Sequence, residues 1–182
     1  MRTVCLWVWL VLALLPPGQP RAAAHGAQYQ DTEIKAAFLY NFAKFVEWPH
    51  EAFARADSPL VIAIAGDDPF GGTLDRLVEG KRVNGHTIVV RRLRNGSPDG
   101  EVHVLFITPS ATHRARQLVE RVKDAPVLTV GDQPGLAKRG VVVNFYVERD
   151  RVRFEVSLEA ARRARLSISS KLLNVARVLD EG

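Results

Sequence analysis

The hydrophobic positions of the chain fall into apolar runs separated by short polar breaks. The run Leu60–Ala65 is apolar throughout and rich in β-branched residues, as a strand buried on both faces of a sheet requires. It ends at residues 66–69, where glycine permits a sharp turn and proline suits the first turn of a helix. The pattern therefore predicts a central strand followed by a helix over residues 70–78.

Two later stretches repeat this pattern of an apolar strand and a polar break. Residues 102–107 break at Thr108-Pro109-Ser110, and residues 127–130 break at a turn that contains Asp132. If these strands run parallel, their breaks meet at the carboxyl edge of one sheet, where open α/β folds bind ligands. Candidate ligand-binding residues at this edge are therefore Asp67, Asp68, Ser110 and Asp132.

Two interpretations of these polar residues are open. Adjacent acids after one strand and hydroxyls after another are typical of phosphoacceptor domains, in which carboxylates hold Mg²⁺. We favour the alternative, in which Asp68 and Asp132 accept hydrogen bonds from backbone N–H groups at turns and helix starts. We expect no metal site and no cofactor here.

A long helix is predicted over residues 32–48, where glycine and proline are absent until Pro49. Its polar stripe is narrow, so the helix is expected to pack across the sheet and to be buried over most of its circumference. A second interpretation leaves part of its aromatic surface, at Phe42 and Trp48, exposed for a partner protein or a second copy of the chain.

The remaining pattern completes a single α/β domain. We predict a mostly parallel central sheet flanked by helices, with an antiparallel edge hairpin near the C-terminus. The further predicted elements are strands around a turn at Asn84-Gly85 over residues 81–91, a helix over 110–123, a strand pair at 141–147 and 152–156, and helices over 157–165 and 169–179.

Residues 1–24 have the pattern of a cleavable signal peptide. Arg2 precedes an apolar run over residues 4–15, a Pro-Pro pair breaks the run, and three alanines end at residue 24. The run is shorter than the roughly 20 apolar residues that span a bilayer. The sequence therefore predicts export to the periplasm, with one domain over residues 25–182.

Removal of this segment changes the composition in ways that exclude several functions. Cys5 is the single cysteine of the chain and leaves with the signal peptide, so the exported protein can form no disulfide and no thiolate metal site. The formal net charge falls from +5 to +3, because the segment carries Arg2, Arg21 and no acids. This modest charge and the expected location argue against a nucleic-acid partner.

No arrangement typical of an enzyme is present. The chain has neither a G-x-S-x-G nor an H-E-x-x-H motif, and its five histidines are scattered without ligand spacing. The C-terminal helical region instead has an excess of basic residues, among them Arg162 and Arg163. Such a surface either keeps a helix solvated or contacts an anionic lipid, a glycan or an acidic protein.

Four blocks of sequence, in order, resemble the YfiR family along nearly the whole exported chain. They are residues 34–49 (IKAAFLYNFAKFVEWP), 66–71 (GDDPFG), 127–156 and 168–173 (ISSKLL). The resemblance implies a periplasmic repressor that binds the periplasmic domain of an inner-membrane diguanylate cyclase and keeps cyclic-di-GMP synthesis low, with biofilm formation favoured on release. It also implies a homodimer and, in some systems, an outer-membrane lipoprotein as a further partner. Cysteine pairs that some members use are absent here.

We therefore expect a regulator that binds and restrains a membrane protein and catalyses no reaction. The expected partner is a diguanylate cyclase or another sensor protein, contacted by Phe42 and Trp48 together with Arg162 and Arg163. The alternative is a periplasmic module that binds a small ligand or an envelope component and acts on a sensor kinase or receptor.

Overall fold

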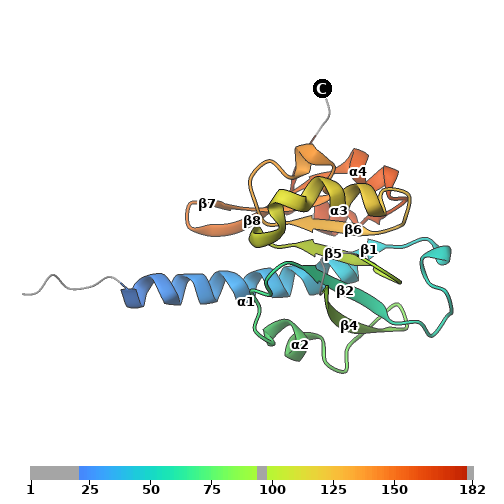
Figure 1. Cartoon of the computed structure of the whole chain (residues 1–182), viewed down its shortest axis with the longest axis horizontal. Coiled ribbons are helices and arrows are strands. Elements are labelled where there is room, and N and C mark those ends of the chain that lie inside the picture. The colour runs from blue at the N-terminus through green and yellow to red at the C-terminus, as the bar shows by residue number, and fades with distance from the viewer. Residues whose placement is uncertain (1–20, 94–97, 180–182) are drawn as a thin grey trace, which may run out of the picture.

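The computed structural model describes residues 21–93 and 98–179, which form an α/β domain built on one large mixed sheet (Figure 1). The strand order is β10-β8-β7-β6-β5-β2-β4-β3, and a separate two-stranded sheet pairs β1 with β9. The strands are β1 Val46–Glu47, β2 Leu60–Ala65, β3 Arg82–Val83, β4 His86–Leu93, β5 Val104–Ile107, β6 Leu128–Gly131, β7 Val143–Glu148, β8 Arg151–Ser157, β9 Ser167–Ile168 and β10 Arg177–Leu179. The helices are α1 Arg21–Phe45, α2 Thr73–Val78, α3 Ala115–Val122, α4 Leu158–Arg163 and α5 Ser170–Leu173, with 3₁₀ turns η1 His50–Ala52, η2 Pro109–Arg114 and η3 Ala137–Arg139.

The predicted parallel core of the sheet is confirmed. Strand β2 lies between β4 and β5 and pairs with both in parallel, and β5, β6 and β7 continue the parallel arrangement. The register places Ala65 beside Ile107, Ile107 beside Gly131, and Gly131 beside Asn144. Ala65 also lies beside Leu93 of β4, so the carboxyl ends of β4, β2, β5 and β6 are aligned at one edge of the sheet.

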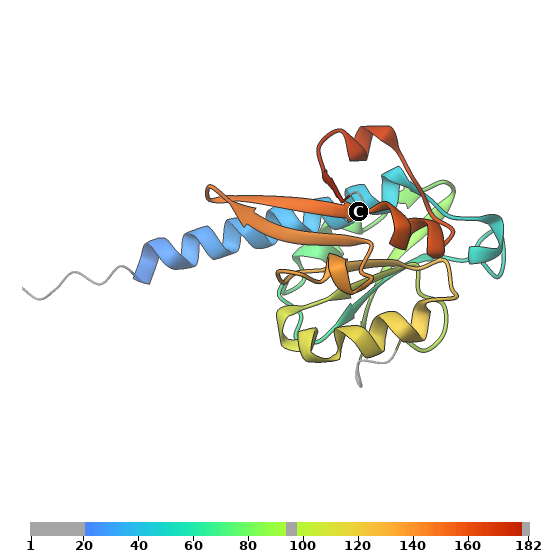
Figure 2. The same cartoon turned by 90° about the horizontal axis from the view of Figure 1, so that it is seen from above.

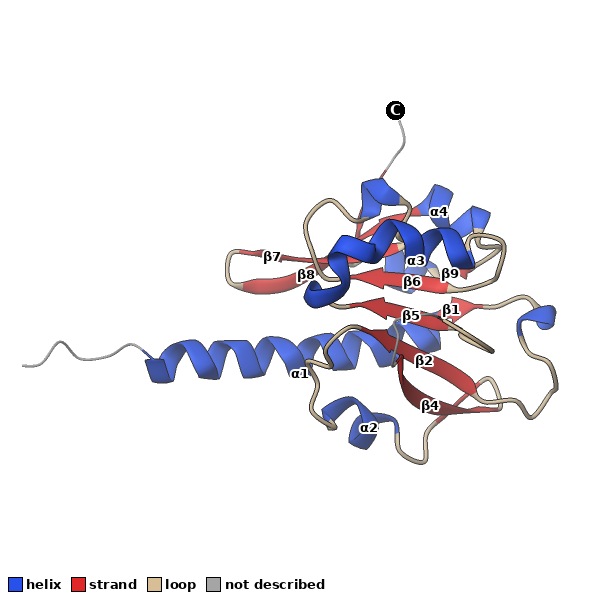
Figure 3. Ribbon diagram, viewed as in Figure 1, coloured by secondary structure: helices blue, strands red, loops and turns tan. Residues whose placement is uncertain are grey.

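The two faces of the sheet carry separate hydrophobic cores, as Figure 3 shows by the helices on either side. Ile62 and Ile64 of β2 point into the core beneath α1 and α2. Ala63 and Ala65 point into the opposite core, beneath α3. This alternation along a strand that is buried at every position explains why the sequence of β2 is an unbroken apolar run.

Helix α1 differs from its predicted bounds at both ends. It begins at Arg21, so it includes the end of the predicted signal peptide, residues 1–24, of which residues 1–20 lie outside the described part of the chain. It ends at Phe45, because Val46–Glu47 forms strand β1 and pairs antiparallel with β9. The N-terminal half of α1 extends past the sheet, beside the β7–β8 hairpin (Figure 2).

Phe42 of α1 lies in the core and is fully buried. Its ring packs against Phe38 of the same helix and against Phe145 and Phe154 of the β7–β8 hairpin, with centroids 5.9, 5.6 and 5.1 Å away. The expectation that Phe42 is exposed for a partner is therefore wrong. The interpretation that α1 packs across the sheet is confirmed.

The predicted C-terminal hairpin is also confirmed, and its turn at Arg149-Asp150 has the positive φ values, 51° and 57°, of a tight hairpin turn. One short strand, β10, lies outside it and pairs in parallel with β8. The helix predicted over residues 169–179 is reduced to α5, because residues 177–179 form β10. Among the described residues, no helix is both long and apolar enough to cross a membrane.

Candidate functional site

The carboxyl ends of β2 and β5 form the switch point of the sheet, where ligands of open α/β folds usually bind. Helix α2, which follows β2, packs into one core, whereas α3, which follows β5, packs into the other. The two chain segments therefore leave the adjacent strands toward opposite faces. Three of the predicted ligand residues, Asp67, Asp68 and Ser110, lie at this point.

Gly66 packs closely against the hydroxyl groups of Thr108 and Ser110, which follow β5, and leaves little space at this switch point. Gly66 has φ +102°, and a Cβ at this position would lie 2.1 Å from Thr108 Oγ1 and 2.6 Å from Ser110 Oγ. The backbone N–H of Asp67 donates to Ser110 Oγ at 2.8 Å. The turn after β2 is thus packed directly onto the turn after β5, in the place where a ligand would enter.

The hydrogen bonds of Thr108 and Ser110 also determine where each hydroxyl proton points. Thr108 Oγ1 donates to the carbonyl oxygen of Ala65 at 3.0 Å. Its remaining contact, with Ser110 Oγ at 3.0 Å, then requires Ser110 to be the donor. Because each hydroxyl proton is committed to a structural hydrogen bond, neither residue is placed as a nucleophile with a neighbouring base.

Asp68 belongs to a network of two carboxylates around one arginine. Its Oδ1 accepts from the backbone N–H of Phe70 at 2.8 Å, and its Oδ2 accepts from Arg92 Nε and Nη2 at 2.9 and 2.7 Å. Arg92 also donates to Asp75, and this hydrogen bond lowers the pKa of the Asp75 carboxyl and raises the pKa of Arg92. The favoured interpretation of Asp68 as a turn-stabilising residue therefore agrees with its contacts.

Asp132 lies apart from this network and pairs with Lys35 of α1. The Nζ atom of Lys35 is 2.7 Å from Asp132 Oδ1, and both side chains are less than one-fifth exposed. Burial raises the pKa of Asp132, and the ion pair with Lys35 opposes that shift. The expectation that Asp132 caps a turn is corrected to an ion pair between α1 and the sheet. Among the described residues, no cluster of acids and histidines has the arrangement of a metal site.

The opposite edge of the sheet carries an aromatic stack that the sequence analysis did not find. The ring of Phe53 lies between those of His86 and His103, with centroids 3.7 and 4.3 Å away. The stack borders a cavity of about 660 Å³ that is also lined by Trp48 and His50. Phe53 lies between the predicted first helix and the strand Leu60–Ala65, and its isolated aromatic ring is the one sequence signal of this stack.

His103 is the buried member of this stack, and its contacts fix one neutral tautomer. Its Nδ1 accepts from the backbone N–H of Val61 at 3.1 Å, so the proton is on Nε2, which donates to the carbonyl oxygen of Ala52 at 3.0 Å. Burial lowers the pKa of His103, although the hydrogen bond to Ala52 opposes this effect. His103 is therefore a structural histidine with a hydrogen bond at each ring nitrogen.

The lowered pKa predicts a pH dependence of stability. His103 binds a proton more weakly in the folded than in the unfolded chain, so its contribution is complete above about pH 6.5 and is lost as the pH falls below that value. Urea unfolding of the wild type and His103→Gln from pH 8 to pH 5 should therefore show a stability difference that narrows toward acid. His113→Gln, at an exposed position, should leave the slope unchanged, and a constant difference for His103→Gln would contradict the assignment.

The arginines predicted to contact a partner lie on α4 and are both exposed. Arg163 Nη1 pairs with Glu159 Oε1 at 2.8 Å. Just beyond the helix, Arg165 Nε lies 3.9 Å from Glu51 Oε1 of the η1 turn, which follows Trp48 in the chain. The end of α4 therefore borders the segment that carries Trp48, and the two regions can belong to one surface.

A comparison with known families matches residues 32–177 to a family model described as YfiR/HmsC-like. The chain belongs to the YfiR/HmsC-like family. The match covers the structure from the first helix to the beginning of β10. Membership supports a regulatory protein connected with cyclic-di-GMP signalling, and the periplasm is the compartment of the family. No curated protein matches the chain.

Proposed function

We propose that the chain is exported, binds the periplasmic domain of an inner-membrane diguanylate cyclase, and represses it. The observation that carries this proposal is the YfiR/HmsC-like match over residues 32–177. The contacts at the sheet edge support a role without catalysis, since the hydroxyls of Thr108 and Ser110 and the carboxylate of Asp68 all have structural partners. Two further predicted partners, a second copy of the chain and an outer-membrane lipoprotein, stay predictions.

Repression follows from binding one state of the partner more tightly than the other. If the chain prefers the inactive arrangement of the cyclase, the equilibrium shifts toward that arrangement by the difference between the two binding free energies. A signal that weakens this preference releases the cyclase. No reaction of a small molecule is needed.

We place the contact surface on α4 and on the neighbouring segment around Trp48. Arg162 and Arg163 offer exposed positive charge, and Trp48 is partly exposed beside the η1 turn. Tryptophan and arginine are the residue types that contribute most often to protein interfaces. The buried Phe42 is excluded from this surface.

A charge reversal on α4 tests this placement. We expect Arg162→Glu/Arg163→Glu to weaken binding to the periplasmic domain of a diguanylate cyclase from the same organism by about tenfold or more, because two favourable charges become unfavourable. Calorimetric titration measures the affinity, and cellular cyclic-di-GMP measures repression. The matched control is Arg116→Glu/Arg121→Glu, which makes the same change at exposed positions of α3.

One outcome would contradict the placement of the contact surface, and another would contradict the proposed function. Equal affinities for the α4 variant and the α3 control would move the contact surface elsewhere and leave the function intact. Failure of the wild-type chain to bind the cyclase domain, with unchanged cyclic-di-GMP on deletion of its gene, would remove the proposed function itself.

A further inference from the structure

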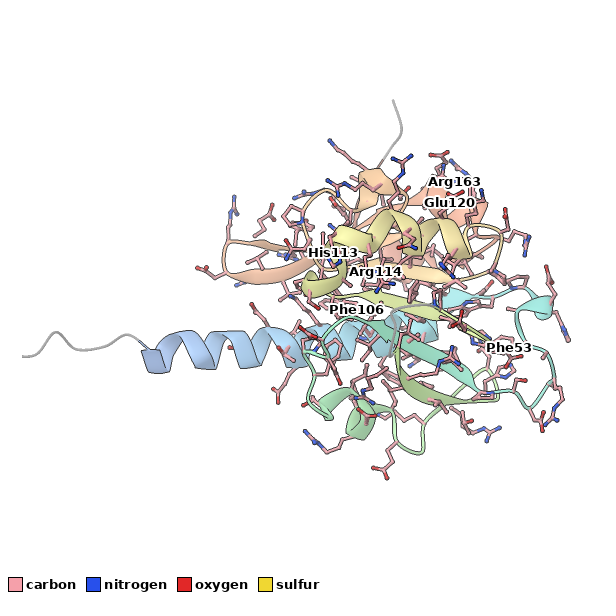
Figure 4. All side chains as sticks on the ribbon, in the orientation of Figure 1. Phe53, Phe106, His113, Arg114, Glu120 and Arg163 are labelled. Atoms are coloured by element: carbon pink, nitrogen blue, oxygen red, sulfur yellow. The ribbon has the colours of Figure 1, made fainter. Side chains whose placement is uncertain are left out.

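A groove between α3, η3 and α4 shares no lining residue with the switch point or with the cavity beside the aromatic stack. It encloses about 430 Å³ and opens to solvent along one side. Figure 4 labels two residues that line it from different helices, Glu120 of α3 and Arg163 of α4. Its volume is within the range of about 300–1,000 Å³ that small-molecule sites occupy.

The groove combines an apolar floor with a cationic rim. Beside Thr129, six aliphatic residues line the floor: Val119, Val122, Val127, Val142, Ala160 and Ala164. Val119 is partly exposed, and the other five are at most 8% exposed. Four cations line the rim, Lys123, Lys138, Arg139 and Arg163, against the single carboxylate of Glu120. Neither surface alone is unusual, but together they match a molecule with an apolar body and a negative head.

Two of the four rim cations are already used by acids of the protein. Lys123 pairs with Glu120, and Arg163 pairs with Glu159 at 2.8 Å. Lys138 and Arg139 are exposed, and within the described part of the chain no acid lies within ion-pair distance of either. Their charges remain uncompensated beside the apolar floor.

The backbone at Gly140 positions Lys138 and Arg139 beside the groove, and the absence of a side chain at Gly140 leaves its entrance open. Gly140 ends η3 with φ +91°, and its N–H donates to the carbonyl oxygen of Ala137 at 3.2 Å. The chain reverses there, directly after Lys138 and Arg139. A Cβ at residue 140 would lie 3.4 Å from Val119 Cγ1 and 3.9 Å from Arg163 Nη2, so it would narrow the space between α3 and α4.

We propose that this groove binds an amphiphilic anion, a single acyl chain that ends in a carboxylate or phosphate. The chain would cover the floor formed by Val119, Val122 and Val142, and the head would pair with Lys138 and Arg139. A free inorganic anion would leave the partly exposed Val119 and the rest of the aliphatic lining without a contact, and a neutral hydrocarbon would leave the two charges without a partner. The inference does not depend on the proposed repression of a cyclase.

Calorimetric titration of the exported chain with decanoate below its micelle concentration tests the proposal. We expect decanoate to bind and decyltrimethylammonium, which has the same tail length and the opposite charge, to bind at least about tenfold more weakly. Lys138→Gln/Arg139→Gln should weaken decanoate binding by about tenfold or more. The matched control, Arg116→Gln/Arg121→Gln on the outer surface of α3, should bind as the wild type does.

Methyl NMR shifts of Val119, Val122 and Val142 give a second readout that does not depend on charge. Decanoate should shift these methyl groups in the wild type. Equal binding of the two amphiphiles, undiminished binding by Lys138→Gln/Arg139→Gln, or shifts elsewhere in the protein would each overturn the assignment.

A second experiment distinguishes a membrane lipid from a free acyl anion as the ligand. Binding to vesicles of phosphatidylglycerol and phosphatidylethanolamine that is lost in Lys138→Gln/Arg139→Gln would identify a lipid head and chain, whereas binding of decanoate alone would identify a free acyl anion. Binding to neither overturns the proposal. If the double variant instead loses only affinity for the cyclase domain, the groove is a protein contact and the proposal is wrong.

Discussion

Replacing Phe42 with alanine is expected to lower the free energy of unfolding by about 3–5 kcal/mol, the range for deleting a fully buried phenylalanine. Its ring contacts Phe38, Phe145 and Phe154, so the substitution would leave a cavity between α1 and the β7–β8 hairpin. Urea unfolding followed by circular dichroism measures the loss. Reduced repression by this variant would then report lost folding and not a lost partner contact.

Phe45→Ala is the matched control for this experiment. Phe45 lies less than one helical turn further along α1 and is only partly buried, with the ammonium of Lys44 5.4 Å from its ring centroid. The same atoms are deleted, but less apolar surface is lost from the core, so the loss of stability should be clearly smaller. Equal losses for Phe42→Ala and Phe45→Ala would show that burial is not the cause.

Replacing Gly66 with alanine is expected to cost about 3 kcal/mol or more, because two unfavourable effects add. The backbone has φ +102°, and the new methyl group would lie 2.1 Å from Thr108 Oγ1, a hydroxyl held in place by the carbonyl oxygen of Ala65. The turns after β2 and β5 would have to separate. Thermal and urea unfolding should both register the loss.

Gly71→Ala separates the two effects at Gly66. Gly71 also has a positive φ, +53°, but a Cβ there would meet nothing within 4 Å. This variant should therefore lose only the cost of placing a residue with a Cβ at positive φ, about 1 kcal/mol. If Gly66→Ala is no more harmful than Gly71→Ala, the close approach at the switch point is not a source of strain on substitution.

The elements that the sequence predicted best are those whose local pattern agrees with their burial. Strand β2 was predicted to the residue, because Leu60–Ala65 is apolar at every position and is bounded by turn residues. The turn at Asn84-Gly85 was predicted because it needs positive φ values, which are 50° and 89° in the structure. In these places, local preference and tertiary packing favour the same conformation.

The predictions failed where a partner distant in the sequence decides the conformation. Residues 46–47 continue a helical pattern but form a strand because β9 lies beside them, and residues 177–179 do the same beside β8. The stack of Phe53, His86 and His103 and the pairing of Lys35 with Asp132 likewise join residues that no spacing rule connects. Phe42 was assigned to a surface because a helix that is apolar over most of its circumference does not reveal which of its apolar residues face the core.

The two-stranded sheet between β1 and β9 has a consequence for synthesis of the protein. Val46 pairs with Ile168, so about 120 residues separate the two strands along the chain. Contacts of such high sequence separation form slowly, since a long loop must close before they contribute. A chain still attached to the ribosome cannot make this contact until nearly all of it has emerged, which leaves the end of the first helix available to a chaperone for almost the whole of translation.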